Sequence, residues 1–246
     1  MEKTKDLSGS LAIGWCDPGN VDSFFMSSIV SAISNINKIE GIEGLGFVQI
    51  VGNQIAKQRS DLLAEFEESG LEWLLWIDSD IMFDVNHIKM LWEAKDAVKR
   101  PVVSGIYFIT FEPFMSLYRP MPCIFKFKNN EIGNQPVHPL PDPSEDTLIP
   151  IDAAGMGFTL MHKSVAKKLR EAYGNTTFAI EIGDKHISED VSFFWKLKEL
   201  NIPVYAHNLC RLTHLKRFML DDNYYRLWYE VVEPAREKAE QEKQQI

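Results

Sequence analysis

Two aspartates separated by a single residue follow an apolar run, and they are the residues of this chain best suited to chemistry. Asp78 and Asp80 flank Ser79 and come directly after the run WLLWI at 73–77. A carboxylate at the end of a buried strand is costly unless it is paired, hydrogen-bonded or bound to a cation. Oxygen ligands suit Mg²⁺ or Mn²⁺, and such an ion keeps coordination positions for substrate phosphates. The pattern indicates a cation site, with a solvated turn that caps the next segment as the alternative.

A second pair of acids and one histidine occur much later in the chain. Glu189 and Asp190 come directly after Ser188, at the start of the helical pattern SEDVSFFWKLKEL. Serine is a good N-cap and acids in the first turn suit the helix dipole, so a structural role alone would explain them. His214 lies in CRLTHLKR, just after the last expected strand. Because imidazole is a common metal ligand, His214 is a candidate to complete the cation site.

One arginine lies inside an apolar stripe. In the helix expected at 54–68, the apolar residues share one face at about 100° per residue, and Arg59 falls within that face. A cation on a buried face needs a partner. Arg59 therefore either forms an internal salt bridge or extends towards a phosphate or nucleotide at the edge of the sheet.

Two further segments carry small or turn-forming residues. Cys16 and Asp17 open the turn CDPGN, whose residue types are those of ordinary turns. Gly155 and Gly157 lie in AAGMGF, and Asp152 precedes them. Glycine weakens a strand, so its presence indicates either the close approach of another group or a bulge.

The elements that position these residues alternate along the chain. Apolar runs separated by helical patterns indicate a parallel sheet covered on both faces, with ligands at the carboxyl ends of its strands. Neither GxGxxG nor GxxxxGK(S/T) follows the first strand, which argues against a Rossmann dehydrogenase or a P-loop NTPase. We expect strands at 11–15, 46–52, 73–77, 101–108, 151–162 and 203–207, and helices at 22–37, 54–68, 85–98, 163–173, 188–200 and 222–246.

Composition narrows the class of protein. The 246 residues include 26 Lys+Arg and 35 Asp+Glu, a net charge of −9 that argues against a nucleic-acid-coating surface. No apolar run reaches the roughly 18 residues that a membrane span needs. The three cysteines are far apart and give neither a disulfide framework nor paired zinc spacing. We expect a reduced, cytoplasmic protein.

Two regions stand outside the alternating pattern. Residues 136–150 hold five of the twelve prolines and are expected to form a loop. The helical tail at 222–246 begins with aromatic residues and ends with polar ones, and Pro234 is where it would break. The aromatic part is expected to pack onto the domain, or alternatively to contact an acceptor or a second subunit.

The order of these features resembles a glycosyltransferase of the GT-A fold, close to family 2 and its relatives in bacteria and bacteriophages. The resemblance covers roughly residues 11–217 and implies an α/β protein with a Rossmann-like mixed, mainly parallel sheet flanked by helices. In that family an apolar strand ends in DxD, as it does here in Asp78-Ser79-Asp80. Where relatives often carry Ala-Arg-Asn, this chain has Gln58-Arg59-Ser60, so only the arginine matches.

The resemblance also implies roles for individual residues. It implies that Asp78, Asp80 and His214 bind Mn²⁺ or Mg²⁺, and that this ion holds the diphosphate of a nucleotide sugar. It makes Asp190 the base of an inverting reaction, with Glu189 beside it in acceptor binding. The implied nucleotide-sugar contacts are Cys16, Asp17, Arg59, Asp78, Ser79, Asp80, Asp152, Gly155 and Gly157.

We therefore expect a metal-dependent glycosyltransferase that moves a sugar from a nucleoside-diphosphate donor to a hydroxyl of a protein, glycan or nucleic acid. Residues 1–217 would form the transferase domain, and 218–246 a helical tail through which the chain could form a homo-oligomer. The expected location is the cytoplasm, that of the host if the chain is phage-encoded.

Two alternatives stay open. A nucleotidyltransferase would carry a Gly-rich, Lys/Arg-bearing loop where this chain has DPGN. A non-catalytic sugar- or nucleotide-binding protein would not need acids and a histidine around a cation.

Overall fold

The computed structural model describes residues 7–109, 120–127, 134–136, 147–182, 185–216 and 222–244. It divides into two compact units. One comprises residues 1–108 and 122–215, and the other 109–121 and 216–246. None of the helices in the described ranges combines the length and the apolar character that a membrane crossing requires.

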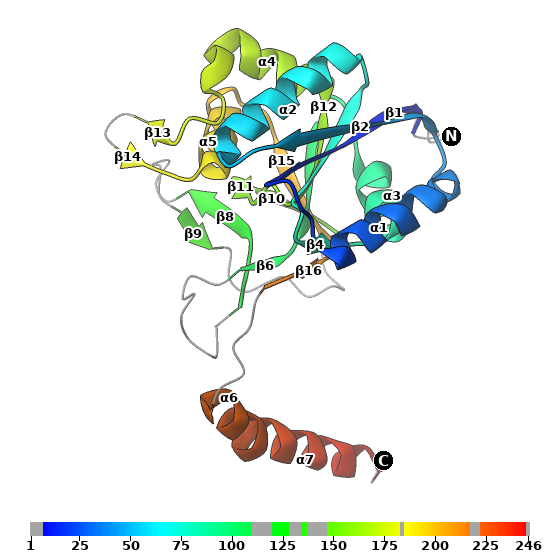
Figure 1. Ribbon diagram of the computed structural model, residues 1–246, viewed down its shortest axis with the longest axis vertical. Helices are drawn as coiled ribbons and strands as arrows, with labels where there is room; N and C mark the ends of the chain where they lie inside the picture. The colour runs from blue at the N-terminus through cyan, green and yellow to red at the C-terminus, as the bar shows by residue number, and fades with distance from the viewer. Residues whose placement is uncertain are drawn as a thin grey trace. The chain divides into compact units, whose positions relative to one another are not determined.

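The larger unit is built on a seven-stranded sheet with the order β10-β15-β5-β12-β3-β1-β2 (Figure 1). β1, β2 and β3 are parallel, as are β5 and β15, while β12 runs against both of its neighbours and β10 against β15. The predicted mixed, mainly parallel sheet is thus confirmed. The strands are β1 Gly9–Asp17, β2 Ile42–Val51, β3 Trp73–Ile77, β5 Val102–Ile106, β10 Leu148–Ile151, β12 Phe158–His162 and β15 Val204–Arg211.

Helices cover both faces of this sheet. In Figure 1, α2 and α4 lie on one side and α1 and α3 on the other. Every residue of β3 and of β5 is buried between these layers, as the unbroken apolar runs predict. The helices of the larger unit are α1 Ser23–Ser34, α2 Ile55–Ser69, α3 Val85–Ala94, α4 Lys163–Tyr173 and α5 Glu189–Glu199, with short 3₁₀ turns at Ile36–Lys38 and Gly174–Thr176.

Short strands complete the architecture. The segment 151–162, expected to be one strand, is divided between two sheets, because β11 pairs with β8 while β12 joins the main sheet. The short strands are β4 Ile81–Met82, β6 Phe108–Ile109, β7 Met121–Pro122, β8 Ile124–Phe127, β9 Asn134–Pro136, β11 Ala153–Ala154, β13 Glu181–Ile182, β14 Lys185–His186 and β16 Thr213–His214. Most of the proline-rich segment 136–150 lies outside the described residues.

One expected helix ends earlier than its pattern predicts. α3 stops at Ala94 rather than at residue 98. The Asp96 carboxylate accepts the N–H groups of Val98 (3.0 Å) and Lys99 (2.8 Å), which builds a turn in place of another helical turn. Local side-chain bonding therefore overrides the helical periodicity here.

The C-terminal tail is helical throughout its described part. It comprises α6 Asp222–Leu227, a π-helical turn Trp228–Val232 and α7 Glu233–Gln244. Pro234 does not break it, because the π-helical turn Trp228–Val232 comes just before the proline and such a turn accommodates an irregular hydrogen-bonding pattern inside a helix. Tyr225 and Tyr229 stack within this tail with ring centroids 4.5 Å apart, and both remain largely exposed.

A buried lysine anchors α5, the helix that begins with Glu189. The Lys196 ammonium donates to the carbonyls of Thr176 and Thr177 (3.0 Å to the latter) and to the Ser192 hydroxyl (3.0 Å). Burial lowers the pKa of Lys196 from 10.5 to about 8. Charging this group inside the protein therefore costs more than charging it in water.

This cost predicts a pH dependence of stability. Between pH 8 and the ordinary lysine value near 10.5, the unfolded chain binds more protons at this site than the folded protein does. The free energy of unfolding of the wild type, relative to Lys196→Met, should therefore rise with pH across this window. Chemical denaturation of both proteins at several pH values measures the difference. A difference that is flat or falls with pH would contradict the assignment.

Candidate active site

The DSD turn closes the carboxyl end of β3 next to the start of β12. The Asp78 N–H donates to the carbonyl of Gly157 (3.1 Å), and the Ile81 N–H donates to the carbonyl of Asp78 (3.0 Å). Asp78, Ser79 and Asp80 thus form a tight turn and are all half-buried. The turn presents its acids at the sheet edge where ligands of parallel sheets gather.

Arg59 links this turn to the start of α5. Its Nη2 lies 3.0 Å from Asp78 Oδ1 and its Nη1 lies 2.8 Å from Glu189 Oε1. Burial opposes the charge of Arg59, but Asp78 and Glu189 outweigh it and raise the pKa of the guanidinium. Of the two sequence-based interpretations, the internal salt bridge is therefore present, and it joins two segments 130 residues apart in sequence.

Asp80 pairs with the predicted histidine. β4 and β16 are antiparallel with His214 opposite Ile81, and the Leu215 N–H donates to the carbonyl of Asp80 (2.8 Å). This register places His214 Nε2 3.1 Å from Asp80 Oδ2, while His214 Nδ1 lies 2.9 Å from the carbonyl oxygen of Phe108. Both ring nitrogens therefore face acceptors.

A neutral imidazole cannot donate to both of these acceptors. It has one N–H and one lone pair, and a carbonyl accepts only from the N–H. With the proton assigned to Nδ1, His214 donates to Phe108 and turns the lone pair of Nε2 towards the Asp80 carboxylate. Metal-binding histidines in proteins typically donate the other ring N–H to a carbonyl or carboxylate in this way.

The third predicted ligand is not part of this pair. Within the described ranges, no three His, Cys, Asp or Glu side chains are grouped as a metal site would require. Asp78 Oδ1 is held by Arg59 instead. The structure thus brings Asp80 and His214 together and ties Asp78 to the buried arginine.

The acids that begin α5 differ in environment. Burial raises the pKa of Glu189, and Arg59 opposes this rise. Asp190 Oδ1 accepts the N–H of Val191 (2.7 Å) and the hydroxyl of Ser188. Ser188 makes no side-chain capping bond, so the cap expected from its residue type is replaced by this contact with Asp190.

The turn after β1 is satisfied internally. Asp17 is 3% exposed, and its carboxylate accepts hydrogen bonds from Gly19 N (2.7 Å), Gln49 Nε2 (2.7 Å) and Trp15 Nε1 (3.1 Å). The bond from Gly19 N is that of the turn-chemistry alternative, and the other two come from the side chains of strands β1 and β2. Burial raises the pKa of the neighbouring Cys16 thiol to about 12, so this thiol is protonated at neutral pH.

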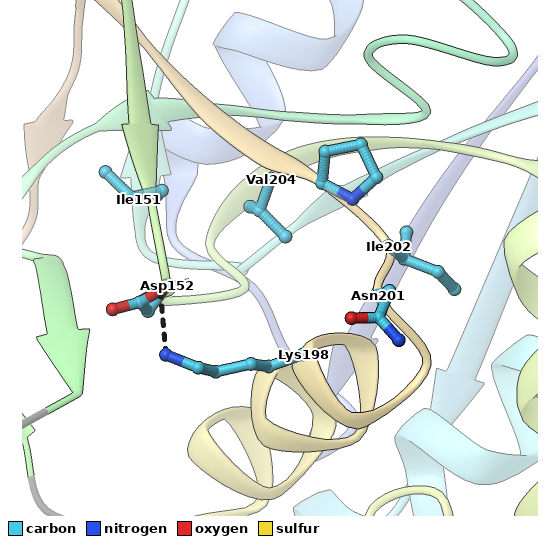
Figure 2. A pocket seen from close by; sticks show the side chains of 7 residues that line it. Ile151, Asp152, Lys198, Asn201, Ile202 and Val204 are labelled. Carbon is cyan, nitrogen blue, oxygen red and sulfur yellow. Dashed lines mark hydrogen bonds and ion pairs between the residues drawn. The ribbon is translucent and has the colours of Figure 1, made fainter. Parts of the chain in front are cut away.

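Asp152 also has partners within the protein. Its Oδ2 accepts the N–H of Phe127 (2.9 Å), and its Oδ1 lies 3.2 Å from Lys198 Nζ. Figure 2 shows this ion pair beside a depression of about 260 Å³ at the C-terminal end of α5. The depression is lined by Ile151, Asp152, Lys198, Asn201, Ile202, Pro203 and Val204.

The two glycines make room for a tyrosine that the sequence interpretation missed. A Cβ on Gly155 would lie 1.8 Å from the hydroxyl oxygen of Tyr107, and one on Gly157 would lie 2.9 Å from its ring. The two glycines lie between β11 and β12 and not inside a strand as expected, but another group does approach them closely, and that group is Tyr107. The sequence did contain a signal for this contact, because Tyr107 is an aromatic residue near the end of the neighbouring strand expected at 101–108.

Comparison with known proteins bears on the fold. No protein-family model matches the chain, and neither does any curated protein sequence. Among solved structures, A197 from STIV is similar over 86% of this chain and 96% of its own, with 16% identity and a TM-score of 0.50. GalNAc-T7, solved with UDP, GalNAc and Mn²⁺, is similar over 90% of this chain, with 13% identity and a TM-score of 0.57.

This chain spans only 48% of the GalNAc-T7 chain. At such identities the similarity shows the fold, and any activity has to be argued from the site. The mixed sheet, the helices on its two faces and these structural neighbours together show that the chain has the GT-A glycosyltransferase fold.

Proposed function

We propose that the protein is a metal-dependent glycosyltransferase that uses a nucleoside-diphosphate sugar as donor. The observation that carries this proposal is the pairing of His214 with Asp80 at the end of the DSD turn. His214 Nε2 and Asp80 Oδ2 lie 3.1 Å apart, and in the neutral Nδ1–H tautomer both atoms offer lone pairs to the same space, which suits a divalent cation coordinated by both.

Asp80 and His214 are proposed as metal ligands, with Asp78 as the third. Arg59 holds only one oxygen of Asp78, and Oδ2 is the atom proposed to reach the cation. Carboxylate and imidazole donors, together with diphosphate oxygens, suit Mn²⁺ or Mg²⁺. When bound, the ion would stabilise the charge that develops on the departing nucleoside diphosphate. GalNAc-T7, whose fold is similar, was solved with Mn²⁺ and UDP.

Arg59 is proposed to join the donor side of the site to the acceptor side. It contacts Asp78 of the DSD turn and Glu189 of α5 at once. Because it is buried and doubly paired, it fixes the separation of these two acids before any substrate binds. We propose that Glu189 binds the acceptor, and that Asp190 is the base if the reaction inverts the anomeric centre.

The remaining predicted donor contacts divide into two groups. Cys16 lies half-buried near the end of β1 and Ser79 lies half-buried in the turn after β3, and we retain both as proposed contacts of the nucleotide sugar. The other four already have partners within the protein. Hydrogen bonds or ion pairs hold Asp17 and Asp152, and other side chains pack closely against Gly155 and Gly157. For these four we propose that they shape the site without touching the donor.

The domain and partner assignments are also proposals. Residues 1–217 would bind the donor and an acceptor that bears a hydroxyl, whether protein, glycan or nucleic acid. The tail at 218–246 exposes Tyr225 and Tyr229, and it would bind an acceptor or a second subunit. A screen of nucleoside-diphosphate sugars with Mn²⁺, following release of nucleoside diphosphate, tests the proposed reaction. Release of pyrophosphate would indicate a nucleotidyltransferase instead.

Asp80→Ala should abolish turnover while leaving the protein folded. The substitution removes the carboxylate that faces His214, and the backbone bond from Leu215 N to residue 80 survives. Turnover and melting temperature are measured together, with the exposed Glu43→Ala as control. Wild-type turnover in the presence of excess chelator would refute the dependence on metal.

Arg59→Met should destabilise the protein by about 3 kcal/mol and reduce turnover. Removal of the buried cation leaves Asp78 and Glu189 facing each other without compensation. The matched control is Lys57→Met, which breaks an exposed pair with Asp61 and should cost about 0.5 kcal/mol or less. Equal costs for the two variants, measured by chemical denaturation, would contradict the proposed role.

Asp190→Asn should slow transfer roughly 10²–10⁴-fold if this residue is the base. Asparagine still accepts the hydrogen bonds of Val191 and Ser188, so stability should change by only about 0.3–1 kcal/mol. Transfer rate, donor affinity and melting temperature are measured on one preparation, with Asp61→Asn as control. Near-normal transfer would remove Asp190 from the base role and favour a retaining mechanism.

A further inference from the structure

Tyr107 fills a space that the backbone of the site leaves open. It follows β5 and is 4% exposed. Its hydroxyl accepts the N–H of Gly157 (3.3 Å), and its carbonyl accepts the N–H of Cys123 (2.8 Å). Any side chain on Gly155 would collide with the hydroxyl, since a Cβ there would lie 1.8 Å from the oxygen. The two glycines and the ring therefore form one packed unit.

One edge of this unit contacts His214. The rings of Tyr107 and His214 are 5.0 Å apart between centroids and meet edge to face at 80°. The residue after Tyr107 supplies the carbonyl that accepts the His214 Nδ1–H (2.9 Å). Tyr107 and the residue after it thus supply the packing and the hydrogen-bond partner of the imidazole.

The opposite edge supports the DSD turn. Gly157 receives the Tyr107 contacts, and its carbonyl accepts the N–H of Asp78 (3.1 Å). A Cβ on Gly157 would also lie 3.1 Å from Asp78 Oδ2. Burial, reinforced by Cys123 and Asp78, raises the pKa of Tyr107 well above its usual value, so the hydroxyl stays neutral. A neutral ring can sit beside these acids without repelling them.

We propose that Tyr107 is a positioning residue for the cation site, holding His214 opposite Asp80 and the Gly157 backbone against Asp78. The inference rests on the proposed function, because it assigns to Tyr107 the alignment of the proposed metal ligands. Tyr107 itself contacts neither substrate nor metal in this scheme. Its removal should weaken metal binding beyond what the loss of a buried aromatic ring explains.

The test measures Mn²⁺ affinity by electron paramagnetic resonance for Tyr107→Leu, Tyr107→Phe and a matched control. Phe66→Leu is the control, because Phe66 is fully buried on α2 and loses a comparable ring. Tyr107→Leu should weaken Mn²⁺ binding about 10–100-fold. This is the usual cost of losing a residue that does not bind the metal itself but holds one of its ligands in place. Phe66→Leu should lower the melting temperature about as much as Tyr107→Leu does but leave the Mn²⁺ affinity unchanged. Tyr107→Phe should keep most of the wild-type Mn²⁺ affinity.

A second readout is independent of metal. Nitrogen-15 NMR of the His214 imidazole should show the Nδ1–H tautomer in the wild type and a mixture of tautomers in Tyr107→Leu. If that variant fails to fold, Gly155→Ala displaces the ring through its hydroxyl, 1.8 Å from the new Cβ, and should have the same effect, because the atoms nearest to that Cβ belong to Tyr107 and Cys123 and not to a proposed ligand. Equal Mn²⁺ affinity and an unchanged tautomer in the variants would overturn the inference. A wild type that binds no Mn²⁺ would refute the proposed function, while the tautomer would still decide the role of Tyr107.

Discussion

A single buried guanidinium sets the geometry of the site. Arg59 lies on α2 with its charge inside the protein. The charge is tolerated there because Asp78 and Glu189 each accept a hydrogen bond from one of the terminal nitrogens of Arg59. These acids belong to segments that are far apart in sequence, one at the end of β3 and one at the start of α5. The ion pairs therefore fix where α5 begins relative to the sheet edge. Gly157, which directly precedes β12, lies against Asp78, so its position depends on the same arrangement.

The second constraint is an imidazole between two acceptors. β16 pairs with β4 in the register that brings His214 beside Asp80, and Phe108 takes the only proton of a neutral ring. In that tautomer, Nε2 and the carboxylate oxygen of Asp80 both offer lone pairs, an arrangement that suits a cation between them. Arg59 and the proposed cation would share the DSD turn, the arginine holding Oδ1 of Asp78 and the cation binding Asp80 together with Oδ2 of Asp78. This sharing explains why the described residues show a pair of ligands and not a preassembled triad.

Much of the fold was predictable because the central strands β3 and β5 are buried along their whole length and read as mainly apolar runs. β3 with its two following acids is the clearest case. The division of 151–162 between two sheets was not predictable, because pairing partners depend on contacts distant in sequence. The same holds for Arg59, whose position in an apolar stripe required a partner without revealing which one. The glycines at 155 and 157 correctly indicated a close approach, but only packing identifies Tyr107 as the approaching group. Asp17 carried a turn signal, and the bond from Gly19 N is that of a turn, but the bond from Gln49 of β2 depends on strand pairing and was not predictable.

The central claim is that Asp80 and His214 bind a divalent cation that holds the donor diphosphate. The most direct measurement is an anomalous difference map at the manganese edge, from crystals grown with Mn²⁺ and a nucleoside diphosphate. The account predicts a peak within coordination distance of His214 Nε2 and Asp80, with diphosphate oxygens completing the coordination. A direct hydrogen bond between His214 and Asp80 with no anomalous peak beside it, at saturating Mn²⁺, would contradict the account.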